Sequence, residues 1–183
     1  RAVCAKHGLG LHLDGARLYN AIVANKHDPK VFGKEFDTIS LCLSKGLGAP
    51  MGTVLMGNAD LMKNAIRIRK ILGGGMRQVG YMAAGAYYAL HHHVDRINVD
   101  HERAKDIEKT LNNHPLIKAV DHVETNIVIF YLQPHLDELK FMRDLEEKGI
   151  RISNMGNGKM RLVTHLDYTE DQHHFFIETL KSL

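Results

Sequence analysis

Two apolar runs, residues 36–44 and 52–56, are joined by a very short connection. Each run has the length and apolar character of a buried strand. A crossover between parallel strands needs a dozen or more residues, whereas only about eight separate these two runs. If the two predicted strands pair, they therefore pair antiparallel.

The first half of the chain alternates such runs with helical segments, which is the pattern of an α/β domain. Residues 9–14 form a further short apolar run, for which we expect a strand. The opening residues indicate the last turns of a helix that Gly8 ends, so we expect an upstream part of a longer protein. We expect further helices over residues 16–24, 60–72, 79–93 and 97–113.

After Pro115 the order changes to strand, strand, helix, strand, strand, helix. This order is typical of a small α+β sandwich in which helices cover one face of a mainly antiparallel sheet. We therefore predict two domains, residues 1–105 and residues 106–183. In the second domain we expect strands over 119–121, 126–132, 150–153 and 159–164, and helices over 136–148 and from Thr169 onward.

Composition excludes several classes of protein. Hydrophobic residues are 44% and charged residues 25%, which is too apolar for a disordered chain. No stretch approaches the roughly 18 apolar residues that span a bilayer. Basic and acidic residues nearly balance, with a net charge of +3, so we expect no nucleic-acid or membrane partner. Two cysteines, Cys4 and Cys42, exclude a disulfide scaffold and suit a reducing compartment, and we expect a cytoplasmic location.

Charged residues end two of the predicted strands. Asp14 ends the run 9–14, and open α/β sheets place ligand-binding groups at the carboxyl ends of their strands. The alternative is that Asp14 caps the helix that follows. Lys45 follows the run 36–44 and is bordered by glycine, so a partly buried amine there could act as a nucleophile. The alternative is a lysine that extends from a turn into solvent.

Arginines and a histidine run provide further candidates. Arg77 follows three glycines, which predict either a tight loop near another group or a flexible linker. Arg161 lies between apolar neighbours in a predicted strand, where it either binds a carboxylate in bidentate fashion or faces solvent. The run 91–93 consists of histidines, but neighbours on a helix diverge by about 100°, so we expect a solvated helix end and no metal site. Cys42 is expected to be a small core residue.

Four segments together resemble the low-specificity L-threonine aldolases, which belong to the aspartate-aminotransferase fold group of pyridoxal-phosphate enzymes. The resemblance extends over the whole chain and covers about the second half of a family member. It implies an α/β fold: the C-terminal part of a PLP-dependent transferase-like large domain, with a mixed, mainly parallel sheet, followed by a small α+β C-terminal domain. The four segments are residues 11–17, 43–50, 69–78 and 161–165.

The resemblance also implies roles for individual residues. Lys45 would bind pyridoxal 5′-phosphate covalently, and Asp14 would pair with its pyridine nitrogen, which keeps the ring able to accept electrons. Arg17 would contact the phenolic oxygen of the cofactor. Arg161 would bind the α-carboxylate of the substrate.

The implied reaction is retro-aldol cleavage of L-threonine, L-allo-threonine and related β-hydroxy-α-amino acids to glycine and an aldehyde. Lys70 and Arg77 would lie near the cofactor phosphate across the interface of a homodimer or homotetramer. The family's phosphate-binding loop and two site histidines belong to its first half, so we expect this chain alone to bind the cofactor poorly. Two alternatives stay open: another enzyme of the same fold that acts at Cα, and an inactive truncated fragment.

Overall fold

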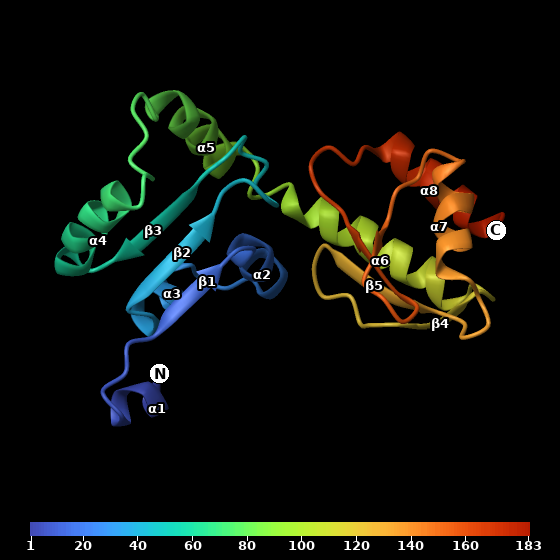
Figure 1. Cartoon of the computed structure of the whole chain (residues 1–183), viewed down its shortest axis with the longest axis horizontal. Helices are drawn as coiled ribbons and strands as arrows, with labels where there is room; N and C mark the ends of the chain where they lie inside the picture. Colours follow the sequence, from blue (N-terminus) through green and yellow to red (C-terminus); the bar gives the residue numbers. More distant parts are fainter. The chain divides into compact units, whose positions relative to one another are not determined.

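The computed structural model describes residues 1–183, which separate into two units, Arg1–Ile97 and Asn98–Leu183 (Figure 1). The long helix α6 (Ile97–Asn112) begins at this boundary, whereas the predicted boundary after residue 105 falls within it. The division comes earlier because Ala104, Ile107 and Leu111 of α6 are buried in the core of the second unit.

The first unit contains a three-stranded sheet in the order β1-β2-β3, formed by β1 (His12–Gly15), β2 (Thr38–Cys42) and β3 (Thr53–Gly57). β1 and β2 are parallel, and β3 runs antiparallel to β2, which confirms the prediction from the short connection. The sheet is therefore mixed, with one parallel and one antiparallel pairing. All five residues of β3 are exposed, although three of them are Val54, Leu55 and Met56.

Five helices accompany this sheet: α1 (Ala2–Lys6), α2 (Leu18–Asn25), α3 (Lys30–Glu35), α4 (Ala59–Ile71) and α5 (Gly80–His92). Gly8, with φ of 64°, follows α1 as predicted, because glycine adopts the left-handed conformation without steric cost. The Asn58 side chain caps α4 by accepting a hydrogen bond from the Leu61 amide at 2.9 Å. Helix α3 was not predicted.

The core of the first unit lies between the end of β2 and helix α5. Leu41, Leu43, Leu47 and Ala49 are buried together with Ala86 and Ala89 of α5 and Ile97. Small residues let α5 approach closely: a Cβ at Gly85 would lie 3.0 Å from Cδ of Pro50. Helix α5 therefore supports the segment that follows β2.

The second unit has an antiparallel sheet in the order β4-β5-β7-β6, made of β4 (Ile117–Val120), β5 (Ile127–Leu132), β6 (Ser153–Asn154) and β7 (Lys159–Val163). Helices α7 (Glu138–Glu146) and α8 (Glu170–Lys181) complete the predicted α+β pattern. Thr169 and Gln172 form a capping box at the start of α8.

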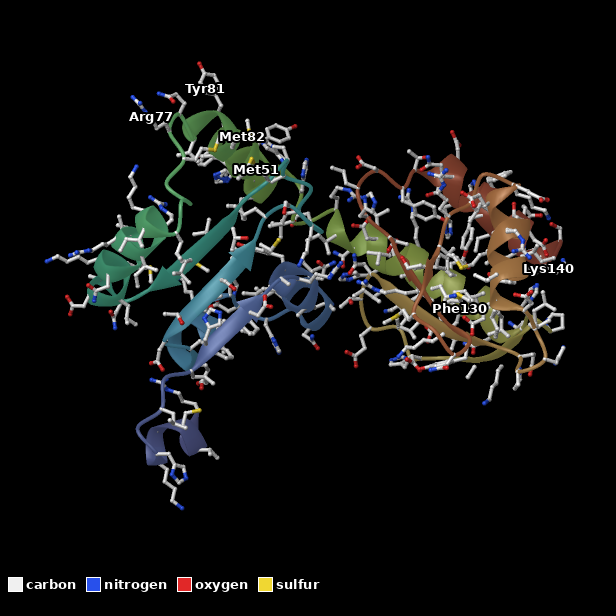
Figure 2. The ribbon with its side chains drawn as sticks, viewed as in Figure 1. Met51, Arg77, Tyr81, Met82, Phe130 and Lys140 are labelled. Atoms are coloured by element: carbon white, nitrogen blue, oxygen red, sulfur yellow. The ribbon has the colours of Figure 1, made fainter.

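Alternate residues of β5 form the centre of the second core. Val128, Phe130 and Leu132 are buried, and Figure 2 shows Phe130 within the second unit. The Phe130 ring meets the Phe141 ring of α7 edge to face, with centroids 6.4 Å apart. One face of the sheet is thus covered by helices. No helix of the chain combines the length and the hydropathy that a bilayer crossing requires.

Candidate active site

One face of the β1–β2 pair is polar and open. Asp14 is paired with Ser40 and His12 with Thr38, and directly paired residues point to the same face of a sheet. His12 Nδ1 lies 2.8 Å from Thr38 Oγ1, and the Asp14 side chain is exposed. The opposite face carries the buried Ile39. The sheet therefore separates an apolar core from a polar surface that carries Asp14.

Asp14 stabilises the turn that leads from β1 to α2. Its Oδ1 accepts a hydrogen bond from the Ala16 amide at 3.1 Å, while Arg17 occupies the N-cap position of α2. The alternative reading of Asp14 as the helix cap is therefore wrong. The strands approach so closely here that a Cβ on Gly15 would lie 2.7 Å from the Ser40 carbonyl oxygen.

Lys45 lies in a tight turn after β2. The Gly48 amide donates to the Lys45 carbonyl at 2.8 Å, and Gly48 has φ of 69°. Gly46 is buried against α2, where a Cβ would lie 2.5 Å from Oδ1 of Asn20. The Lys45 side chain itself is exposed, not partly buried as the sequence suggested. The turn is thus firmly packed, while the amine it carries is accessible.

The charge of Lys45 acts on Cys42, the last residue of β2. Burial raises the pKa of the Cys42 thiol, but hydrogen bonds with Ser44 and Thr53 and the positive charge of Lys45 outweigh burial, so the pKa is lowered. Cys42 is therefore a half-buried, polarised thiol and not the plain core residue that was predicted. Since Cys42 shares the face of Ser40, the Lys45 charge acts on the face that carries Asp14.

Lys70 and Arg77 belong to the same unit. Lys70 lies near the end of α4, and its side chain packs over the glycine loop: a Cβ at Gly75 would lie 3.0 Å from Cδ and 3.8 Å from Nζ of Lys70. Arg77 follows this loop and projects outward close to the start of α5 (Figure 2). Both side chains are exposed.

Arg161 lies in the second unit. It is half-buried in β7, paired with Ile129 of β5 on one side and Ser153 of β6 on the other. It lines a cavity of about 470 Å³ together with Tyr168 and Phe176. The structure therefore brings Asp14, Arg17 and Lys45 to the carboxyl ends of two adjacent strands, and holds Arg161 in a separate unit.

Three residues of the site region were missed by sequence reasoning. They are His12 beside Asp14, Asn20 against Gly46, and His93, which hydrogen-bonds to the turn of Lys45. The glycine after Lys45 signalled a close approach, but the approaching residue lies far away in the sequence. Only for His12, which alternates with Asp14 along one strand, was there a local signal.

Known proteins give an independent view of this chain. The β-eliminating lyase family matches residues 1–135. Low-specificity L-threonine aldolase 1 of Arabidopsis thaliana is 37% identical over 176 residues, which cover 94% of this chain and 49% of that protein. The low specificity L-threonine aldolase of Escherichia coli K12 is 37% identical over 176 residues, with 91% and 49% covered.

A solved structure, the threonine aldolase of Leishmania major, superposes with a TM-score of 0.80 at 22% identity, covering 99% of this chain and 54% of that one. The predicted α/β fold class is confirmed by this likeness. The chain spans about half the length of the curated relatives it matches. Because the family match extends over most of its residues, the chain belongs to the β-eliminating lyase family.

Proposed function

We propose that this chain is the lysine-bearing part of a pyridoxal 5′-phosphate-dependent aldolase that cleaves L-threonine, L-allo-threonine and related β-hydroxy-α-amino acids to glycine and an aldehyde. One observation carries the proposal: Asp14 lies near the carboxyl end of β1, and Lys45 follows the carboxyl end of the adjacent parallel strand β2. The names of the relatives from Arabidopsis thaliana and Escherichia coli support the substrate class.

The donor groups at this edge suit pyridoxal phosphate chemically. An amine at Lys45 matches the cofactor aldehyde, a carboxylate at Asp14 matches the pyridine nitrogen, and the Arg17 guanidinium matches the phenolic oxygen. Both Asp14 and Lys45 are exposed, and opposite Asp14 the face carries only the short side chain of Ser40. A flat ring therefore has access to these groups.

Asp14, Lys45 and Arg161 would have different roles in the proposed reaction. When bound, pyridoxal phosphate supplies a ring that accepts the electron pair of the breaking Cα–Cβ bond. Asp14 would stabilise the proton on the ring nitrogen, and a protonated ring accepts electrons more readily. Lys45 supplies the amine that attaches the cofactor and can afterwards hold or return a proton at Nζ. Arg161 binds the substrate α-carboxylate through two parallel N–H···O bonds.

Assembly into a homodimer or homotetramer is part of the proposal, with Lys70 and Arg77 binding the cofactor phosphate across the interface. Helix α4 supports it because the helix has no buried residue. Ile71 and Leu72, at its end, are 71% and 79% exposed, and such apolar surface is usually covered by a partner. Both cysteines are unpaired, in keeping with the proposed cytoplasmic location.

The decisive experiment uses the polypeptide as its gene encodes it. Incubation with pyridoxal 5′-phosphate followed by reduction with borohydride should label Lys45. In a separate assay without borohydride, the protein with pyridoxal 5′-phosphate should convert threonine to glycine and acetaldehyde. Lys45→Ala should lose both the label and the product, whereas Lys34→Ala, at an exposed lysine of the same unit, should keep both. A label on another lysine, or conversion of threonine to products other than glycine, would refute the assignment.

A further inference from the structure

The imidazole of His93 is hydrogen-bonded to the turn that carries Lys45. His93 is the C-cap residue of α5, and its Nδ1 lies 2.7 Å from the carbonyl oxygen of Leu47. A carbonyl oxygen can only accept a hydrogen bond, so Nδ1 must carry the hydrogen. This requirement selects the Nδ1–H form of the neutral ring, and the charged ring satisfies it as well.

The other contacts between α5 and this turn are apolar. Gly85 packs against Pro50, and Ala89 is buried in the same cluster as Leu47 and Ala49. Such contacts press the helix and the turn together, but they depend little on direction. The hydrogen bond from His93 depends on both distance and angle. It is therefore the directional contact by which α5 orients the Leu47 peptide group.

The neighbouring histidines do something different. His91 and His92 are exposed. The His91 ring meets the Tyr87 ring edge to face, with centroids 4.1 Å apart, and the His92 ring lies tilted against the Tyr88 ring, with centroids 4.2 Å apart. The Tyr88 ring also meets the half-buried His93 ring edge to face, with centroids 5.5 Å apart. Tyr88 thus restrains the imidazole whose nitrogen points at the turn.

The Leu47 carbonyl belongs to the same tight turn as Lys45. Leu47 is 2% exposed, so water cannot easily replace a lost donor. The turn closes through the Gly48 amide and the Lys45 carbonyl, which links the orientation of the Leu47 peptide directly to the backbone of Lys45. A change at His93 should therefore alter where the Lys45 amine projects.

We propose that His93 is a positioning residue for Lys45, acting through its Nδ1–H and the Leu47 carbonyl. The inference rests on the proposed function of Lys45. Loss of the donor leaves the amine in place but poorly oriented, and misplacement of a reacting group by about 1 Å can cost on the order of 100-fold in rate. We expect kcat to fall by about tenfold or more while KM changes by less than about threefold, since Arg161 is untouched.

Four variants separate positioning from folding. His93→Asn places an amide nitrogen close to the position of Nδ1. His93→Leu removes the donor and fills the space of the ring with an apolar side chain of moderate size. His93→Gln keeps a polar side chain but places its nitrogen one bond farther out, so it covers the case in which the leucine variant does not fold. His92→Leu is the control, because His92 stacks on the same tyrosine without reaching the turn.

Two measurements complete the test, both on the polypeptide as its gene encodes it. Imidazole nitrogen NMR without cofactor should show His93 as the Nδ1–H form. The rate of borohydride-trapped labelling of Lys45 by pyridoxal 5′-phosphate should fall about tenfold in His93→Leu and His93→Gln, and stay within about twofold in His93→Asn and His92→Leu.

An Nε2–H form of His93, or unchanged labelling and kcat in folded His93→Leu or His93→Gln, would overturn the inference. The two proposals can fail separately. If Lys45 of the unaltered protein is never labelled, the proposed function falls and the positioning role falls with it, although the NMR result still reports the hydrogen bond. If Lys45 is labelled at the same rate in every folded variant, only the positioning role falls.

Discussion

Replacement of Gly46 by alanine tests how tightly the turn of Lys45 is packed. The added Cβ would lie 2.5 Å from Oδ1 of Asn20 and 3.3 Å from its Cγ and Nδ2. Ordinary van der Waals contact begins near 3.4 Å, so the nearest atom is about 0.9 Å too close. Asn20 is 2% exposed and has little space to retreat. Gly46 is not in the left-handed region, so the effect is steric and not a backbone strain.

Overpacking of this kind costs about 1–3 kcal/mol, and we expect Gly46→Ala to lower the free energy of unfolding by that amount. Urea denaturation followed by circular dichroism measures the change. Gly33→Ala and Gly80→Ala are matched controls, because both glycines lie in helices with no atom within 4 Å of an added Cβ. Alanine there should be neutral or stabilising, by up to about 1 kcal/mol.

A double-mutant cycle with Asn20→Ala identifies the source of the cost. If the Asn20 amide causes the clash, Gly46→Ala should cost at least about 1 kcal/mol less in the Asn20→Ala background than in the unaltered chain. Costs that add to within about 0.5 kcal/mol would show that the two residues do not contact each other as described. An unchanged stability of Gly46→Ala alone would refute the packing argument itself.

Because the pKa of Cys42 is lowered, its alkylation by iodoacetamide should reach half-maximal rate at a lower pH in the folded chain than in urea, and Lys45→Met should raise that pH. Phe130→Ala should lower the free energy of unfolding by about 3–5 kcal/mol in urea titrations, and a loss under about 1 kcal/mol would contradict the burial of this ring. Hydrogen bonds from the Lys140 and Leu139 amides lower the pKa of Asp137. The stabilising effect of this carboxylate is therefore present above the ordinary carboxyl pKa and is lost as pH falls through the lowered value. When the free energy of unfolding is measured by urea denaturation at a series of acidic pH values, Asp137→Asn should reduce its dependence on pH in this range.

Elements with strong local signals were predictable from the sequence. Asn58 before α4, Thr169 before α8 and Gly8 after α1 act within a turn or two of their own position. Gly8 ends α1 as expected, and α8 begins directly after Thr169, where the last helix was expected to start. Helix α3 was missed because it has only six residues, follows Pro29 and contains Gly33. A six-residue helix gives less than two turns of periodicity to recognise.

Contacts between distant residues were not predictable. The strand expected over 150–153 is observed as Ser153–Asn154, and Ile150 and Ile152, which precede it, pack against the core. The histidine run was interpreted as a solvated helix end, which holds for His91 and His92 but is wrong for His93. Its partner is a carbonyl 46 residues earlier, and no local pattern contains that information.

Strand β3 has a practical consequence for anyone who purifies this chain by itself. It lies at the edge of its sheet, and Val54, Leu55 and Met56 are 42%, 44% and 37% exposed, on both faces of the ribbon. An apolar strand with a vacant hydrogen-bonding edge is a template for self-association into aggregates. Light scattering from concentrated solutions should therefore increase over time as aggregates form. Leu55→Lys, which adds one charge to the strand, should delay this increase.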